Sequence, residues 1–178
     1  YAEAAGIPYE TALIRNHYVS RSFIEPTQTI RDFKVRVKHN PIRGFLNGKR
    51  IVLVDDSIVR GPTLVKIVGK LRAAGAREVH VRISSPPTIG PCHYGIDTPN
   101  REELIAHLHT VEEIRERIGA DSLGYLSVEG LRRSAAKEQT RGICDACFSD
   151  DYPVEVEASS AAPQLTLFRA VKEDATEF

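Results

Sequence analysis

The sequence predicts an α/β fold in which a parallel sheet is flanked by helices. An apolar run over residues 51–54 ends in two carboxylates, Asp55 and Asp56, and a helical pattern follows. A second run, with alternating apolar residues, occupies 79–83. Strand, helix and strand in so short a stretch form a βαβ unit, which implies a parallel sheet with a right-handed crossover. At 178 residues the chain is long enough for one domain with a sizeable core.

The other elements follow from spacing and from capping residues. Residues 1–5 are typical of a helix end, closed by Gly6. The helix after the first strand has apolar residues at helical intervals and Gly75 as its cap. Those apolar residues are Leu64, Ile67, Val68, Leu71 and Ala74.

Three further elements are predicted in the second half of the chain. Thr110 and Glu113 have the spacing of a capping box at a helix start. Residues 121–126 are a candidate strand, and Ser127 is a candidate cap for a helix that ends near Glu138. We expect residues 1–150 to form the domain and residues 151–178, rich in Ala, Ser, Pro and acids, to be a weakly ordered tail.

Composition argues against several classes of protein. The 24 basic and 24 acidic residues balance, so net charge does not favour nucleic acid or a membrane surface. No apolar stretch approaches the roughly 20 residues of a spanning helix, and the first residues lack the pattern of a signal peptide. We therefore expect a soluble, cytoplasmic protein. Because the chain contains no methionine, we also expect residues upstream of Tyr1.

Residues 25–50 form a basic region interrupted by Pro26, Pro41, Gly44 and Gly48. The prolines and glycines indicate that part of this region is loop. One interpretation is a solvated basic face, and the other is a mobile basic flap over an anionic ligand. The sequence pattern by itself does not choose between them.

The diacid and the turn after it predict a ligand site. At the carboxyl end of a parallel strand, carboxylates face the edge where ligands bind, and amides at the following helix N-terminus suit phosphate. Carboxylates also accept hydrogen bonds from sugar hydroxyls and bind Mg²⁺. Neither Gly-x-Gly-x-x-Gly nor the P-loop pattern is present, which disfavours the nucleotide-binding folds that use them. A lone Asp here would be read as a helix cap, but Asp-Asp before a glycine turn favours a phosphorylated sugar.

Several motifs together resemble one enzyme family. The segment from Val54 to Gly61, VDDSIVRG, resembles the phosphoribosyl pyrophosphate loop of type I phosphoribosyltransferases. Residues 18–28 resemble the flexible catalytic loop of the amidophosphoribosyltransferases, and residues 94–99 and 103–107 also match that family's pattern. The resemblance extends to about residue 155 and implies the type I phosphoribosyltransferase fold.

The resemblance implies roles for individual residues. Asp55 and Asp56 would hold the ribose hydroxyls and contribute to the Mg²⁺ site. The 5-phosphate would lie against the loop that follows, formed by Ser57, Ile58, Val59, Arg60, Gly61 and Thr63. Four flap residues would act when the flap closes. Arg21 and Lys38 would contact the ligand, and Tyr18 and Ile24 would help line an ammonia passage. Pro62 departs from the pattern, because the family commonly has threonine there and proline lacks an N–H donor.

The family resemblance also implies partners. Phosphoribosyl pyrophosphate would be the substrate, and ammonia would come from a glutaminase domain that lies outside this chain. The chain by itself would be inactive or only partly active. The product would be 5-phosphoribosylamine, at the first step of purine synthesis. A homo-oligomer and feedback by purine nucleotides are further implications. Base-accepting phosphoribosyltransferases and a non-catalytic module that binds phosphorylated ribose remain alternatives.

The chain has three cysteines, Cys92, Cys144 and Cys147, of which the last two form a C-x-x-C. Taken alone this pattern fits a redox pair, a zinc site, two buried thiols, or three ligands of a metal or cluster completed from elsewhere. His93 could complete a zinc site, although an ordinary loop histidine is the simpler interpretation. The resemblance favours the iron–sulfur class of the family. It implies a [4Fe–4S] cluster whose fourth thiolate lies upstream of this chain.

Overall fold

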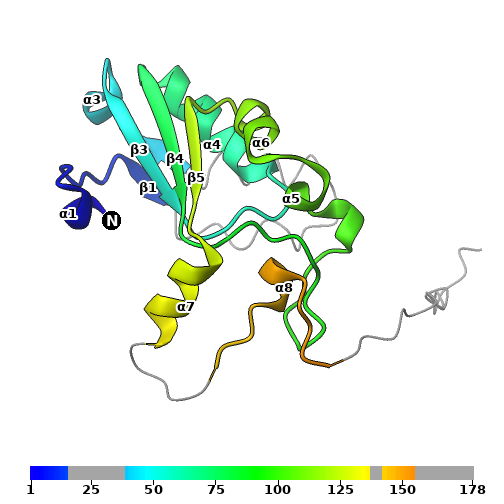
Figure 1. The fold of residues 1–178 in the computed structure, drawn as a ribbon. Coiled ribbons are helices and arrows are strands. Elements are labelled where there is room, and N and C mark those ends of the chain that lie inside the picture. The colour runs from blue at the N-terminus through cyan, green and yellow to red at the C-terminus, as the bar shows by residue number, and fades with distance from the viewer. Residues whose placement is uncertain (16–38, 137–141, 155–178) are drawn as a thin grey trace, which may run out of the picture.

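The computed structural model describes residues 1–15, 39–136 and 142–154, and its centre is a three-stranded parallel sheet (Figure 1). The strands are β3 (Arg50–Asp55), β4 (Glu78–Ile83) and β5 (Ser122–Tyr125), hydrogen-bonded in that order. In the register, Asp55 lies opposite Ile83, and Ile83 lies opposite Tyr125. The predicted α/β fold with a parallel sheet is therefore confirmed.

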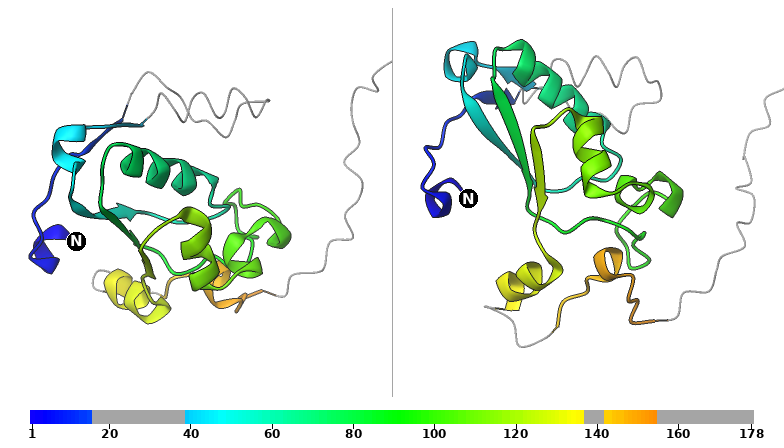
Figure 2. Two further views of the ribbon diagram at one scale, coloured as in Figure 1. Left: turned by 90° about the horizontal axis from the view of Figure 1, so that it is seen from above. Right: turned by 45° about the horizontal axis from the view of Figure 1, so that its top comes forward.

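Two helices cover one face of this sheet. The crossover helices α4 (Pro62–Ala73) and α6 (Val111–Ile118) lie on the same side of the strands (Figure 2). Right-handed crossovers that advance across a sheet in one direction place their helices on one face. The core therefore forms between α4, α6 and the inward side chains of β4. Its fully buried members include Leu64, Val68, Leu71, Val79, Val81, Ile114 and Ile118.

Local signals for helix ends are confirmed in the structure. The Glu113 N–H donates to the Thr110 hydroxyl at 3.3 Å, and the Thr110 N–H donates to the Glu113 carboxylate at 2.7 Å, which completes the capping box of α6. The Ser127 hydroxyl accepts from the Gly130 N–H at 3.0 Å as α7 (Val128–Ala136) begins. Helix α1 (Ala2–Ala5) is closed by Gly6 in the left-handed region.

The structure adds short elements that sequence periodicity did not indicate. An antiparallel pair joins β1 (Leu13–Arg15) to β2 (His39–Pro41), and α3 (Arg43–Leu46) follows it. Three one-turn helices come later: η2 (Arg101–Glu103), α5 (Ile105–Leu108) and α8 (Ala146–Ser149). Helices of three or four residues are too short to show a period. Within the described ranges, no helix is long and apolar enough to cross a membrane.

Candidate functional site

The two carboxylates of the diacid stand in different surroundings at the end of β3. Asp55 is the last residue of the strand, and its carboxylate accepts from the Asp56 N–H at 3.0 Å. The Asp56 carboxylate is exposed and accepts from the Ser57 hydroxyl at 3.0 Å. Burial raises the pKa of Asp55 above its ordinary value. Bound hydroxyls or a divalent cation would compensate a desolvated carboxylate of this kind.

Most backbone amides of the loop from β3 to α4 find no acceptor within the described part of the chain. Among the described residues, no acceptor is found for the N–H groups of residues 57–61. No side chain caps α4, whose N-cap is Gly61 at φ 87°. Amides without acceptors beside a helix N-terminus suit a phosphate group, because their dipoles favour an anion.

Neighbouring elements hold this loop in place. The Ser84 N–H, just after β4, donates to the Asp55 carbonyl at 3.0 Å, and the Ile105 N–H donates to the Val59 carbonyl at 2.9 Å. A Cβ on Gly61 would lie 2.9 Å from the Cδ1 of Ile105, so this glycine permits both the backbone conformation and the close contact. The shape of the loop is therefore fixed by contacts from two later segments of the chain.

Part of the loop is also fixed by burial and charge. Ile58 is only 2% exposed and belongs to the core. Arg60 and Glu103 form an ion pair at 2.7 Å, with both side chains about half exposed to solvent. The apolar anchor therefore contributes more to the loop than the ion pair, which solvent screens.

The three cysteines lie near one another. Cys92 lies in the loop after β4, whereas Cys144 and Cys147 flank the start of α8, and all three are free thiols. The Ile89 and Gly90 N–H groups donate to the Cys147 carbonyl at 2.9 and 3.0 Å. Burial raises the pKa of Cys147, and the nearby Cys92 and Cys144 thiols raise it further.

The arrangement of these thiols bears on the kind of metal group they fit. In the described part of the chain, no three His, Cys, Asp or Glu side chains surround one metal-ion position. A single zinc ion, with Zn–S distances of about 2.3 Å, needs such convergence. The His93 ring instead packs edge-on against Tyr152, with centroids 5.1 Å apart.

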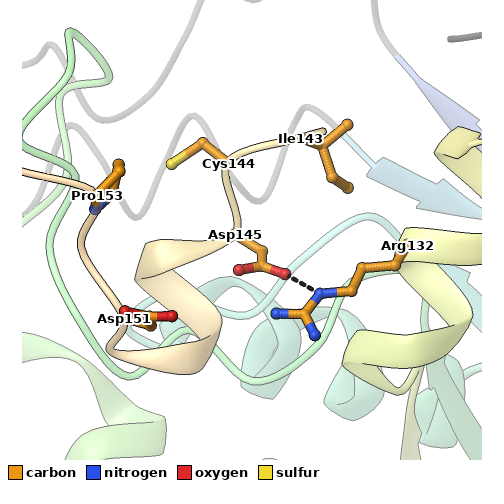
Figure 3. Close-up of a pocket in the computed structure, with 6 residues that line it drawn as sticks. All are labelled: Arg132, Ile143, Cys144, Asp145, Asp151 and Pro153. Carbon is orange, nitrogen blue, oxygen red and sulfur yellow. Dashed lines mark hydrogen bonds and ion pairs between the residues drawn. The ribbon is translucent and has the colours of Figure 1, made fainter. Parts of the chain in front are cut away.

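A cavity of about 250 Å³ lies beside Cys144 (Figure 3). An ion pair between Arg132 and Asp145, at 2.5 Å, forms one side of it. Asp145 also accepts from the Ser149 hydroxyl at 3.1 Å, and its side chain is only 9% exposed. Arg132 in turn lowers the pKa of Asp145, so the carboxylate stays charged in this position. The remaining lining residues are Ile143, Asp151 and Pro153.

Comparison with known proteins shows close sequence similarity to part of the amidophosphoribosyltransferases. No family model matches the chain. It is 55% identical over 168 residues to an amidophosphoribosyltransferase of Bacillus subtilis, and 56% identical over 155 residues to a chloroplastic one of Arabidopsis thaliana. A solved structure of glutamine phosphoribosylpyrophosphate amidotransferase from Bacillus subtilis, complexed with ADP and GMP, covers 93% of the chain at 54% identity and a TM-score of 0.78. The chain is homologous to one segment of the amidophosphoribosyltransferases. It spans 35% of the Bacillus relative, 27% of the Arabidopsis relative and 37% of the solved chain.

The structure shows where Pro62, which departs from the amidophosphoribosyltransferase pattern, lies in the loop and helix. It occupies the start of α4, where proline is favoured because an N–H at the first helical position has no helical acceptor. Proline at this position therefore fits the helix, but it offers a ligand neither the N–H nor the hydroxyl that threonine would offer. Weaker phosphate binding remains a prediction.

The structure leaves part of the predicted amidophosphoribosyltransferase site untested. The four flap residues, Tyr18, Arg21, Ile24 and Lys38, lie outside the described residues. Sequence reasoning missed Ser84 and Tyr152, which the structure places beside the two sites, and it gave no role to Ile105 within the 103–107 motif. Each acts through a contact distant in the sequence, so no local spacing could have indicated it.

Proposed function

We propose that this chain carries out the phosphoribosyl-transfer step of an amidophosphoribosyltransferase. Ammonia would attack C1 of phosphoribosyl pyrophosphate, the C1–O bond would break, and pyrophosphate would leave to give 5-phosphoribosylamine. One loop supports this most. It carries the diacid, and the five amides of residues 57–61 find no acceptor among the described residues. The Bacillus subtilis neighbour is named for glutamine and phosphoribosylpyrophosphate, which is consistent with that ligand chemistry.

In this proposal the loop binds and orients the substrate, and no side chain acts as a nucleophile. Asp55 and Asp56 accept hydrogen bonds from the ribose hydroxyls, and the amides after them bind the 5-phosphate. The two carboxylates would also hold Mg²⁺, which would supply positive charge to the departing pyrophosphate. Holding the sugar rigidly places C1 in line for attack.

We propose in addition that Cys92, Cys144 and Cys147 ligate a [4Fe–4S] cluster, with a fourth thiolate from outside this chain. The closeness of three free thiols supports a shared metal group, and the resemblance to the iron–sulfur class supports a cluster over zinc. Pyrophosphate displacement needs no electron transfer, so the cluster's role would be structural or oxygen-sensing. Cytoplasmic location, a homo-oligomer and purine nucleotide feedback belong to the same proposal. The ADP and GMP of the Bacillus structure are consistent with the last point.

A turnover assay tests the transfer step. The chain is incubated with phosphoribosyl pyrophosphate, Mg²⁺ and ammonium salt at alkaline pH, and pyrophosphate release is measured beside an Asp55→Asn variant. We expect release that depends on ammonia and is lost in the variant. Release with adenine, guanine or a pyrimidine base in place of ammonia would support a base-accepting enzyme. Binding without release under any condition would support the non-catalytic module.

A further inference from the structure

Two segments far apart in the sequence lie side by side near the cysteines. Residues 89–94 follow β4, and residues 147–154 follow the start of α8; Figures 1 and 2 show them running next to each other. Their backbones are joined because the Cys147 carbonyl accepts from both the Ile89 and the Gly90 N–H groups. Residues 151–154, on the tail side of the predicted boundary at residue 150, belong to this contact.

Tyr152 fits into a notch that a glycine leaves open. Its hydroxyl donates to the Pro91 carbonyl at 2.7 Å, and its ring packs edge-on against His93. A Cβ on Gly90 would lie 2.4 Å from the Tyr152 hydroxyl, 3.3 Å from Oδ1 of Asp150 and 3.5 Å from Cζ of Tyr152. Gly90 is not among the glycines with positive φ. It is therefore required for space and not for its backbone conformation.

An ion pair fixes the same segment from another direction. Two nitrogens of the Arg101 guanidinium donate to the two carboxylate oxygens of Asp150, at 3.0 and 2.5 Å. Asp150 ends α8 with φ 62°, in the left-handed region that residues other than glycine seldom adopt. A bidentate partner helps hold this turn, which lies three residues after Cys147.

We propose that Tyr152 is a positioning residue of the cysteine site. Together with the Arg101–Asp150 pair it locks the C-x-x-C segment onto the Cys92 loop before any metal is bound. The inference rests on the proposal that the cysteines hold a cluster. The lock, however, consists of protein contacts alone and can be measured in metal-free protein. Thiols arranged in advance lose less conformational freedom when they bind a metal, which favours binding.

Amide hydrogen exchange on the metal-free chain tests the lock through the Ile89 and Gly90 N–H groups. The variants are Tyr152→Phe, Gly90→Ala and the double variant. We expect Tyr152→Phe to speed exchange about fivefold, the effect of one net hydrogen bond. Gly90→Ala should speed it more, because the added methyl expels the hydroxyl. In the double variant phenylalanine removes the 2.4 Å clash and leaves only the 3.3 Å contact with the Asp150 carboxylate, so exchange should fall back toward the Tyr152→Phe level.

Two controls match the chemistry of these changes. Tyr9→Phe removes the hydroxyl of an exposed tyrosine, and Gly44→Ala adds a methyl where nothing lies within 4 Å. Both should leave exchange at Ile89 and Gly90 unchanged. Unchanged exchange in Tyr152→Phe, or additive effects in the double variant, would overturn the lock.

Anaerobic reconstitution with Fe²⁺, sulfide and a small thiol as fourth ligand provides the second readout. Iron retained per chain should be highest in the wild type, lower in Tyr152→Phe and the double variant, and lowest in Gly90→Ala. If the exchange pattern holds while even the wild type retains no iron, the lock stands and the cluster proposal fails. Equal iron retention in wild type and Gly90→Ala would reject the positioning role.

Discussion

The diacid loop and the cysteine lock differ in whether their polar groups have hydrogen-bond partners within the described chain. In the loop, residues 57–61 have N–H groups for which the described chain offers no acceptor, and burial raises the pKa of Asp55. In the lock, the Cys147 carbonyl accepts two N–H groups and the Tyr152 hydroxyl donates to Pro91. Asp145, almost buried, accepts from Arg132 and Ser149.

This difference is the one expected between a proposed binding site and a scaffold. Polar groups left without partners cost free energy, and a protein retains them where a ligand completes them. The loop has that character, and its partner would be an anionic, hydroxyl-rich molecule. Polar groups that are hydrogen-bonded within the protein hold its local structure without a ligand. The lock has that second character, so we expect substitutions to affect ligand binding in the loop and local order in the lock.

The largest effect is expected from the diacid. Asp55→Asn and Asp56→Asn should each weaken binding of phosphoribosyl pyrophosphate with Mg²⁺ about 10- to 100-fold, because each removes charged hydrogen bonds to the ligand. Neither should lower the melting temperature. Calorimetric titration and thermal melting measure the two quantities. Asp97→Asn, at an exposed aspartate outside the loop, is the control. Equal affinity for phosphoribosyl pyrophosphate in all three variants would contradict the assignment of the diacid loop as the binding site.

A pH series sharpens the same point through Asp55. Since its pKa is raised in the folded protein, there is a pH window above 3.8 in which the folded protein holds a proton that the unfolded chain has lost. Stability without ligand should therefore fall as the pH rises through this window, whereas ligand affinity should fall as the pH drops through it. Asp55→Asn should show neither trend. Denaturant melts and titrations at each pH measure both.

Gly61→Ala should disturb the loop through its backbone. The alanine would need φ 87° and would place its Cβ 2.9 Å from Ile105. We expect a loss of about 1–3 kcal/mol of unfolding free energy, together with weaker ligand binding. Gly44→Ala, which has open space, is the control and should be close to neutral. Denaturant unfolding compares the two, and equal values would show that the loop is not held as described.

Pro62→Thr should strengthen binding, by up to about tenfold, because it restores one N–H and one hydroxyl at the phosphate end of the loop. Stability should change little, since the first helical position tolerates both residues. Titration with ribose 5-phosphate measures the effect on the phosphate alone. A decrease in affinity would indicate that the phosphate lies elsewhere.

The smallest effect is expected in the scaffold, for Arg132→Ala. Asp145 would lose its ion-pair partner, and the loss of unfolding free energy should be small because solvent screens the half-exposed arginine. Arg132 lowers the pKa of Asp145, so this stabilisation is present above the ordinary pKa of aspartate and is lost as the pH falls through the lowered value. Urea unfolding at several pH values should show that the difference in unfolding free energy between wild type and variant disappears in acid. Arg133→Ala, at the neighbouring exposed arginine, should show no such difference.

Local signals predicted much of the fold, and long-range contacts account for what they missed. The βαβ unit and the Thr110 capping box depend on residues close in sequence, so spacing was enough to find them. The diacid was predicted for the same reason, as a strand end followed by a turn. The support from Ile105, and the notch that Gly90 leaves for Tyr152, join segments up to 62 residues apart. No period or motif encodes such contacts.

The central claim is that the diacid loop binds a phosphorylated ribose. It is tested most directly by titrating the chain with ribose 5-phosphate and with phosphoribosyl pyrophosphate, each with Mg²⁺. The account predicts that the two ligands compete for one site and that a double Asp55→Asn, Asp56→Asn variant binds neither while it melts at or above the wild-type temperature. Undiminished binding of either ligand by a folded double variant would contradict it.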